Sequence, residues 1–586
     1  MTDQTVGQQR RGNLAGALKT ALNEPSKSTF LKPIHVYAVI ALAVLGVGRY
    51  FNLYEGSWPN QAFVNCVTLM IASAIVLLTG RLLVAAIAVP AMIFVVVQAA
   101  TFKREAMDMI VHAYDIFFYL MSWATVVFLW EHYRAYLFML VAALAALAIA
   151  VVLAYRYDPT RVSRRYALLA FAVFAFLTPY AADLKGERRH TQYYWADLVV
   201  SSFYSSWAET AQTLWRGTLI EAAPPASANS NAPFVVPTGC SATERPPHIL
   251  LIHQESLVQP SVVPGVSYDK SLDSLFKSSD GKIHQMRVET YGGASWLTEF
   301  SILAGVSTYS FGGMRPFVQA LMAGKVKDTL PEALARCGYR NVVFYPMLKN
   351  FVSNGRFYNA VGMPEIFDMK DQGAPSAMER DRRYYTNMLK LMDTHFRQSD
   401  KPLFTFMITS SGHQPYTHKF APEMDVPGGA PGTNPEMHEF LRREAIAKID
   451  YEWMKAELQR RYPNERFLIV QYGDHHPIAT RSYFGQGKAR AAEDTTFDKD
   501  SAAFITYYAT EGINYDPPKL PDVETLDVPY LGGLVLEQAG LPLSDSYVER
   551  KRLRALCDGR YYGCKQHDEI LTFHRRLIDS GLMVAR

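Results

Sequence analysis

The sequence predicts two unlike parts, an α-helical polytopic membrane domain followed by an α/β domain with a largely parallel central sheet. Long apolar runs fill the N-terminal third, whereas short strand-like runs alternate with helical stretches from His248 onward. A chain of 586 residues is also too long for one hydrophobic core. The net charge of +4 is too small to indicate a nucleic-acid-binding protein.

The N-terminal third contains six apolar runs, and most reach the roughly 17–25 residues that cross a bilayer. They cover residues 34–52, 61–80, 82–101, 115–131, 134–155 and 166–182. We therefore predict a transmembrane domain of five or six helices over 33–184. Basic residues in the tail, 1–32, favour a cytoplasmic N-terminus. Those at 156–165 also look cytoplasmic, which conflicts with six spans unless one run does not cross or the N-terminus is outside.

Residues 185–246 are expected to connect the two domains. Aromatic and charged residues alternate over 185–222, a pattern typical of a helix lying in the membrane interface. The stretch from Pro224 to Pro247 is rich in Pro and small polar residues, as linkers are. The four cysteines beyond the apolar runs allow two disulfides in an oxidising compartment, although free thiols are the alternative. These are Cys240, Cys337, Cys557 and Cys564, of which the last two bracket a short loop.

The remainder, 247–586, is predicted to be an extracytoplasmic α/β domain. The expected strands are His248–Ile252, Gln285–Glu289, Asn341–Phe344, Leu403–Thr409, Phe467–Val470 and Ala503–Tyr508. The expected helices lie at 296–304, 328–336, 380–395 and 438–460. This alternation favours parallel strands, whose carboxyl ends meet at one edge of the sheet and hold the functional residues.

Several polar side chains follow these strands directly. Asp474 and His475 come after the strand that ends at Val470, and Glu255 follows the strand at 248–252. Carboxylate and imidazole groups together suit a divalent cation such as Zn²⁺ or Mn²⁺. The alternatives are an Asx turn with surface histidines at 474–476 and a helix-capping role for Glu255.

A candidate nucleophile lies after two glycines, Gly292 and Gly293, which allow a tight turn. Ser295 follows in the first turn of an expected helix, where the positive end of the helix dipole favours an alkoxide or a bound phosphate. The alternative is that Ser295 is only an N-cap, with Thr298 behind it.

Two further stretches carry candidate substrate-binding groups. His413, after the strand Leu403–Thr409, could donate to a phosphate oxygen or protonate a leaving alkoxide, although a lone histidine is more often structural. Lys349 and Arg356 follow the strand Asn341–Phe344 and could clamp a phosphate, although exposed basic residues are common.

Together these stretches resemble the alkaline phosphatase/sulfatase superfamily, specifically its membrane-bound lipoteichoic acid synthases and phosphoglycerol or phosphoethanolamine transferases. The resemblance is carried by 255–257, by Gly292–Ser295 with Glu299 and Phe300, by 351–362, by 411–413 and by 472–475, in the family's order. The Cys/Ser-x-Pro-x-Arg pattern of sulfatases is absent at the nucleophile stretch, which argues against a sulfatase.

The resemblance implies transfer of a phosphoglycerol or phosphoethanolamine group from a phospholipid to a glycan or glycolipid, through a phospho-enzyme. The expected location is the inner (cytoplasmic) membrane, with the catalytic domain periplasmic or extracellular. Alternatives are a metal-dependent phosphodiesterase or phosphatase, and a catalytically silent membrane sensor.

The resemblance also implies a set of site residues. Glu255, Asp474 and His475, with Ser295 completing the shell, would hold one divalent ion, Mn²⁺ or Zn²⁺. His413 matches the family's substrate-side histidine, and His476 is a candidate ligand for a second metal or for substrate. The chain departs from the family at Ser295, where lipoteichoic acid synthases have threonine, so Thr298 is the fallback nucleophile. It also departs in the spacing of Lys349 and Arg356.

Overall fold

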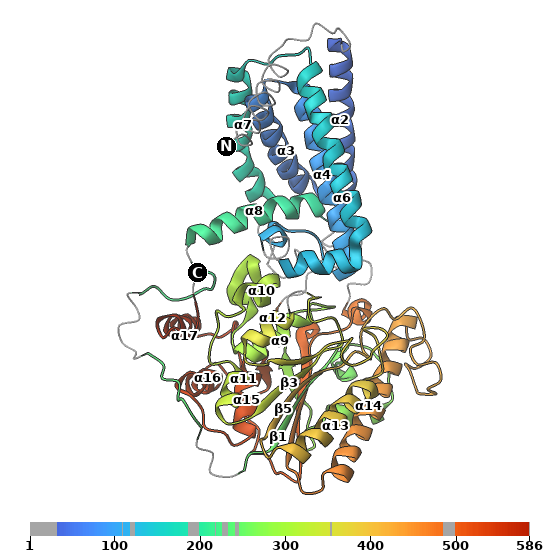
Figure 1. The fold of residues 1–586 in the computed structure, drawn as a ribbon, viewed down its shortest axis with the longest axis vertical. Helices are drawn as coiled ribbons and strands as arrows, with labels where there is room; N and C mark the ends of the chain where they lie inside the picture. The colour runs from blue at the N-terminus through green and yellow to red at the C-terminus, as the bar shows by residue number, and fades with distance from the viewer. Residues whose placement is uncertain are drawn as a thin grey trace, which may run out of the picture. The chain divides into compact units, whose positions relative to one another are not determined.

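The computed structural model describes residues 32–107, 109–117, 123–185, 198–216, 218–225, 233–240, 245–351, 354–484 and 499–584. These residues form two compact units (Figure 1). The first contains the described residues up to Ala113 and those of 129–207. The second contains the described residues of 114–128 and of 208–584.

The apolar N-terminal region forms five helices that are long and apolar enough to cross a membrane, as the sequence predicts. They are α2 (Pro33–Tyr54), α3 (Trp58–Thr79), α4 (Leu82–Met107), α6 (Trp123–Tyr157) and α7 (Arg164–Lys185). The runs at 115–131 and 134–155 do not give two spans. Most of both lies in α6, which is kinked at Tyr133, where the backbone is non-helical, and the preceding α5 (Ala113–Asp115) is only three residues long. Five is therefore the number of candidate spans among the described residues.

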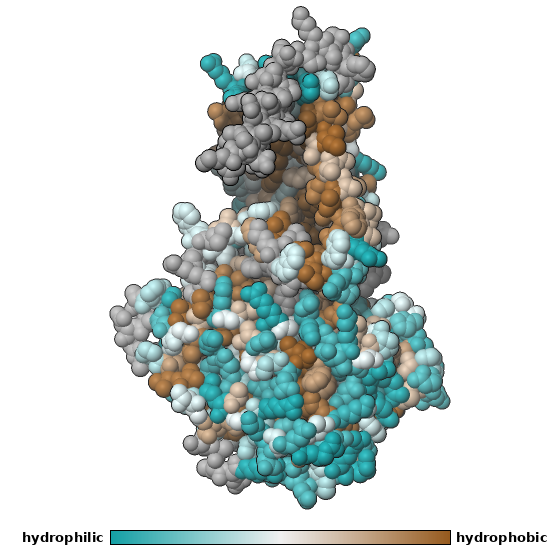
Figure 2. All heavy atoms as spheres, in the orientation of Figure 1, coloured by the Kyte–Doolittle hydropathy of each residue, from teal (hydrophilic) through white to brown (hydrophobic). Residues whose placement is uncertain are grey.

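The surfaces of these helices are strongly apolar. Leu42, Leu45 and Leu169 are 70%, 69% and 62% exposed, and Figure 2 shows a largely hydrophobic face over the bundle. Contiguous apolar surface of this kind is unfavourable in water and suits contact with lipid tails. The face of the α/β unit in the same view is largely hydrophilic.

Part of the expected interfacial segment forms helix α8 (Val199–Arg216). The buried carboxylate of Glu55 accepts hydrogen bonds from the first backbone N–H groups of α8, at Val200 (2.8 Å) and Ser201 (2.9 Å). An acidic group at a helix N-terminus satisfies free donors and complements the helix dipole. The charged and aromatic residues Arg188, Arg189, Tyr193, Tyr194 and Trp195 lie outside the described residues.

The second unit is built on an eight-stranded sheet in the order β4-β3-β5-β1-β6-β7-β2-β8. Neighbouring strands are parallel except that β7 runs antiparallel to β6 and β2. The strands are β1 (His248–Gln254), β2 (His284–Arg287), β3 (Arg340–Phe344), β4 (Glu365–Phe367), β5 (Leu403–Ile408), β6 (Phe467–Gly473), β7 (Ile505–Ile513) and β8 (Thr525–Asp527). All six predicted strands are present. The two that were missed, β4 and β8, have three residues each.

Helices cover both faces of the sheet (Figure 1). One face packs against α13 (Asp381–Gln398) and α14 (Pro435–Arg461), whose Met388, Met392 and Leu441 join the main core. The other carries α9 (Ser295–Ala304), α11 (Leu330–Arg336) and α15 (Leu531–Gln538). The remaining helices are α10 (Val318–Met322), α12 (Asn354–Ala360), α16 (Asp545–Leu556) and α17 (His567–Asp579).

Two disulfides join the four downstream cysteines, Cys240 to Cys337 and Cys557 to Cys564. The first ties part of the expected linker to the α/β unit. In the same stretch, the ring of Phe234 packs against that of Phe573, with centroids 5.8 Å apart. Residues 233–240 thus belong to the folded unit, because an apolar side chain and a covalent bond hold them there.

Candidate active site

The three strands that deliver most of the predicted site residues are neighbours at the centre of the sheet. β1 lies between β5 and β6 and is parallel to both. The register places Gln254, the last residue of β1, opposite Gly473, the last residue of β6. Glu255 and Asp474 therefore leave the same edge side by side.

Two glycines allow the loops at this edge to approach closely. A Cβ at Gly412 would lie 2.1 Å from the backbone oxygen of Glu255, and one at Gly473 would lie 1.9 Å from that of Leu257. Any larger residue would push the loops after β5 and β6 away from the segment after β1. Close packing of these three loops is what holds the site together.

The structure brings Glu255, Asp474 and His475 together. His475 Nε2 lies 3.2 Å from Asp474 Oδ2 and 3.5 Å from Glu255 Oε1. Ser256 fixes both carboxylates: its N–H donates to Asp474 Oδ1 (2.7 Å) and its hydroxyl donates to Glu255 Oε1 (2.8 Å). All four side chains are at least nine-tenths buried.

Ser295 reaches this group from the first position of α9. Gly292, Gly293 and Ala294 all have positive φ, at 72°, 155° and 62°, and form the tight turn that the glycines predict. The Ser295 hydroxyl donates to Glu255 Oε2 (3.0 Å) and lies 3.3 Å from His475 Nε2. Ser295 is half-buried, whereas every other residue of α9 is buried. Its hydroxyl is therefore accessible to a ligand.

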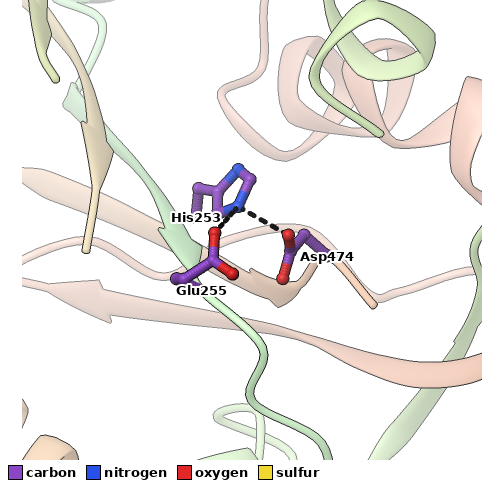
Figure 3. A group of neighbouring side chains, drawn as sticks. All are labelled: His253, Glu255 and Asp474. Atoms are coloured by element: carbon purple, nitrogen blue, oxygen red, sulfur yellow. Dashed lines mark ion pairs between the residues drawn. The ribbon is translucent and has the colours of Figure 1, made fainter. Parts of the chain in front are cut away.

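His253 also lies in this cluster and is missing from the predicted set. It sits on β1 two residues before Glu255, so both side chains point to the same face of the strand. His253 Nε2 is 3.1 Å from Asp474 Oδ2 and 3.7 Å from Glu255 Oε2, and Figure 3 shows the edge of its ring facing both carboxylates. The sequence offered one signal for His253, which is its position two residues before the predicted ligand Glu255.

These groups fit a divalent cation. His475 Nδ1 lies 2.9 Å from the backbone oxygen of His476, which can only accept, so the proton is on Nδ1 and the lone pair is on Nε2. That lone pair faces carboxylate oxygens of Glu255 and Asp474. Asp474 Oδ2 and His253 Nε2 are buried and lack hydrogen-bond partners. Separations of 3.0 to 3.7 Å bracket the ~3.3 Å expected between ligands around tetrahedral zinc.

The pKa shifts of Glu255 and His253 also reflect strong interactions between charges in this cluster. Burial alone would raise the pKa of Glu255, but His253, His475 and His413 hold it well below its usual range. Burial would lower the pKa of His253, but Asp474, Glu255 and Glu299 outweigh it and raise that pKa to about 10. The carboxylates of this cluster therefore favour positive charge beside them.

Two predicted residues have other roles in the structure. Thr298 is fully buried and its hydroxyl donates to the backbone oxygen of Asp474 (2.8 Å). The ring of His476 faces away from the cluster, with Nε2 2.7 Å from the Ile505 oxygen. Burial lowers the pKa of His476 to about 4. The structure thus gives neither the fallback nucleophile nor the second-metal ligand a place at the cluster.

His413 follows β5 and lies close enough for its charge to lower the pKa of Glu255. Its Nδ1 is 2.6 Å from the Gln414 oxygen, which leaves Nε2 for a ligand. Two buried groups hold its loop: Asp381 accepts from the N–H groups of Ser410 (3.1 Å) and Ser411 (3.0 Å), and Arg443 donates to the His413 oxygen.

Lys349 and Arg356 are not part of the cluster. Both are exposed, and the Lys349 ammonium lies 3.5 Å from Asp371. Among the described residues, neither side chain hydrogen-bonds to Glu255, Asp474 or His475. They lie in the loop after β3 and in α12, respectively, so no strand register fixes their position.

Residues 285–498 match the family model described as Sulfatase. This part of the α/β unit is thus similar to the sulfatase family, in agreement with the resemblance. The matched stretch holds Ser295, His413, Asp474 and His475, whereas Glu255 lies before it. The chain is also 22% identical over 350 residues to an uncharacterized protein of Haemophilus influenzae, a match covering 57% of this chain and 59% of that relative.

The chain is also similar to several solved structures. Phosphoglycerol transferase GacH of Streptococcus pyogenes, in complex with sn-glycerol-1-phosphate, is 16% identical, covering 61% of this chain and 97% of that one (TM-score 0.45). Lipooligosaccharide phosphoethanolamine transferase A of Neisseria meningitidis is 13% identical, covering 88% and 94% (TM-score 0.45). Lipoteichoic acid synthase LtaP of Listeria monocytogenes is 16% identical, covering 52% and 76% (TM-score 0.38).

Proposed function

We propose that this protein is a metal-dependent phosphotransferase that moves a phosphoglycerol group, or alternatively phosphoethanolamine, from a phospholipid to a glycan or glycolipid hydroxyl. One observation carries the proposal: the accessible Ser295 hydroxyl meets Glu255, Asp474 and His475 at the N-terminus of α9. A nucleophile, a cation-binding group and a helix N-terminus together suit attack on a phosphodiester.

The cation would be held by Glu255, Asp474 and His475, with Ser295 beside them. A divalent ion bound there lowers the pKa of the serine hydroxyl and neutralises phosphate charge. The residues themselves supply the positioning. Ser256 orients both carboxylates, and Thr298 anchors the backbone of Asp474 from inside α9.

Two displacements complete the proposed reaction. In the first, Ser295 Oγ passes its proton to Glu255 and forms a bond to phosphorus. The bond to the diacylglycerol oxygen breaks, and protonated His413 donates its Nε2 proton to that oxygen. In the second, an acceptor hydroxyl gives its proton to His413 and attacks the phosphoserine, and the Ser295 oxygen leaves and takes its proton back from Glu255. The positive end of the α9 dipole stabilises the phosphate charge in both steps.

The five-helix count supports a catalytic unit outside the cytoplasm. With five spans, a cytoplasmic N-terminal tail places the segment after α7 on the opposite side. The basic segment between α6 and α7, with Arg156, Arg161, Arg164 and Arg165, then lies in the cytoplasm, so both charge signals agree. The two disulfides of the α/β unit suit an oxidising compartment. We propose an inner-membrane enzyme whose catalytic domain is periplasmic or extracellular.

Diacylglycerol release from defined donors tests this function. We would reconstitute the full chain in nanodiscs containing phosphatidylglycerol or phosphatidylethanolamine and add Zn²⁺ or Mn²⁺. Release from one donor that needs the metal, is lost in Ser295→Ala and rises with an added glycan acceptor is expected. The matched control is Ser301→Ala on the same helix, whose hydroxyl contacts Glu289 rather than the cluster.

Other outcomes separate the alternatives. Metal-dependent release that an acceptor does not change would indicate a phosphodiesterase that passes the group to water. No release from either donor by folded, metal-loaded protein would contradict the proposal and favour a silent membrane sensor.

A further inference from the structure

We infer that His253 is an additional ligand of the metal site and that its nitrogen makes the site select Zn²⁺ over Mn²⁺. The inference rests on the cluster geometry and does not depend on the identity of the lipid donor. It adds a residue that the family resemblance does not include.

The position of His253 is that of a ligand rather than of a hydrogen-bonded neighbour. Its ring is fully buried, and Nε2 lies 3.1 Å from Asp474 Oδ2. Among the described residues, neither atom has a hydrogen-bond partner outside the cluster. Two buried polar atoms at this separation, with no other group to satisfy them, suit coordination of one ion.

The surroundings of His253 also match those of a metal-bound histidine. On the far side of the ring, Nδ1 lies 3.0 Å from the Tyr472 hydroxyl and 4.0 Å from Glu299 Oε1. Glu299 is itself held by Tyr358 (2.6 Å) and Gln319 (3.1 Å). Metal-bound histidines commonly direct their second nitrogen to such a partner. When the Tyr472 oxygen accepts from Nδ1, the Nε2 lone pair of His253 faces the carboxylates.

A second imidazole changes the chemistry of the donor set. Glu255, Asp474, His475 and Ser295 would supply one nitrogen and three oxygens, a set that Mn²⁺ accepts well. With His253 the set has two nitrogens among five groups. Imidazole favours Zn²⁺, whereas carboxylate and hydroxyl oxygens suit Mn²⁺. His253 therefore raises zinc affinity much more than manganese affinity.

Metal titration of the full chain in detergent micelles tests this directly. Dissociation constants for Zn²⁺ and Mn²⁺ would be measured by calorimetry or chelator competition for wild type and His253→Gln, which offers an oxygen at similar reach. We expect zinc affinity to fall by about 100-fold or more and manganese affinity to change little. The visible spectrum of the Co²⁺-substituted protein should change as well.

Two further variants complete the test. Tyr472→Phe, which loses only the group behind Nδ1, should weaken zinc binding by about 10-fold. His284→Gln, a histidine on β2 that pairs with Asp280, should change neither metal. Equal losses for both metals in His253→Gln, or no loss, in protein with a wild-type unfolding midpoint without metal, would overturn the inference. No lipid is present, so this outcome is independent of the phosphotransfer test.

Discussion

The residues that follow the central strands and those that follow β3 belong to the same α/β unit but differ in burial and in contacts. β1 and β6 end in buried side chains that converge within 3.5 Å of one another, whereas Lys349 and Arg356 after β3 remain exposed. The register of parallel strands brings Gln254 opposite Gly473, so that Glu255 and Asp474 follow side by side. The site forms where strand ends and the glycine turn before α9 fix the backbone, whereas Lys349 and Arg356 lack such a constraint.

The same contrast holds between near neighbours in sequence. His475 faces the cluster while His476 bonds to β7, and Ser295 faces the cluster while Thr298 lies buried one turn deeper. Residue type alone does not separate the members of these pairs. Their backbone positions do.

The two hydroxyl residues of α9, Ser295 and Thr298, should show the largest difference in turnover when each is replaced. Ser295→Ala removes the proposed nucleophile, so turnover should fall by about 10⁴–10⁶-fold. Thr298→Val keeps the shape but leaves the Asp474 oxygen without a donor, which should reduce stability by about 1–3 kcal/mol with turnover largely kept. Diacylglycerol release and thermal unfolding measure the two effects. Equal loss of turnover in both variants would contradict the different roles given to Ser295 and Thr298.

The histidine pair after β6 should separate metal binding from folding. His475→Gln should weaken zinc binding by at least about 100-fold. His476→Gln loses the buried bond to Ile505 and should reduce stability by about 1–3 kcal/mol, with metal affinity unchanged. Calorimetric titration and unfolding midpoints distinguish them. A large loss of zinc affinity in His476→Gln would place both histidines at the metal.

The loop after β5 depends on a buried carboxylate whose charge opposes folding. Burial, followed by the charge of Asp450, raises the pKa of Asp381 from 3.8 to about 7. Between these values the folded protein binds more protons than the unfolded chain, so this contribution to stability falls as pH rises from 4 to 7. Asp381→Asn keeps an acceptor for Ser410 and Ser411 and should abolish this pH dependence.

We expect the stability of Asp381→Asn relative to wild type to improve by roughly 1–4 kcal/mol between pH 4 and pH 8. Scanning fluorimetry across this range measures it. A constant difference at every pH would show that Asp381 is already ionised in the folded protein.

Replacing the exposed basic residues after β3 should have the smallest effect on kcat/KM. Lys349→Ala and Arg356→Ala should each reduce kcat/KM by no more than about 10-fold, and salt should diminish the effect. Steady-state rates at low and high ionic strength measure it. A loss of more than 100-fold at Arg356 would instead support the phosphate clamp that the sequence suggested.

The sequence predicted the elements with long regular patterns and the residues that directly follow them. Strand ends at Val470 and Ile252 located Asp474, His475 and Glu255, and the glycine turn located Ser295. His253 was missed although it directly follows the predicted strand end at Ile252. In the structure β1 continues to Gln254, and residue type alone does not show that the His253 ring faces the carboxylates. β4 and β8 are too short to show a two-residue alternation.

The membrane helices show the other limit of sequence reasoning. Composition identifies apolar runs but does not show whether 115–131 and 134–155 are separate spans. That depends on the kink at Tyr133, where the backbone of α6 is non-helical (φ −134°, ψ 28°). The roles of Thr298 and His476 depend on which backbone oxygen lies nearby, and that is a property of the folded structure.

The most direct test of the central claim is intact-mass analysis of the full-length protein after exposure to metal and each lipid donor, followed by peptide mapping. We predict a metal-dependent adduct with the mass of phosphoglycerol or phosphoethanolamine, located on Ser295, absent in Ser295→Ala and retained in Thr298→Val. An adduct located on Thr298 or elsewhere, or no adduct on metal-loaded protein that turns over lipid, would contradict the account.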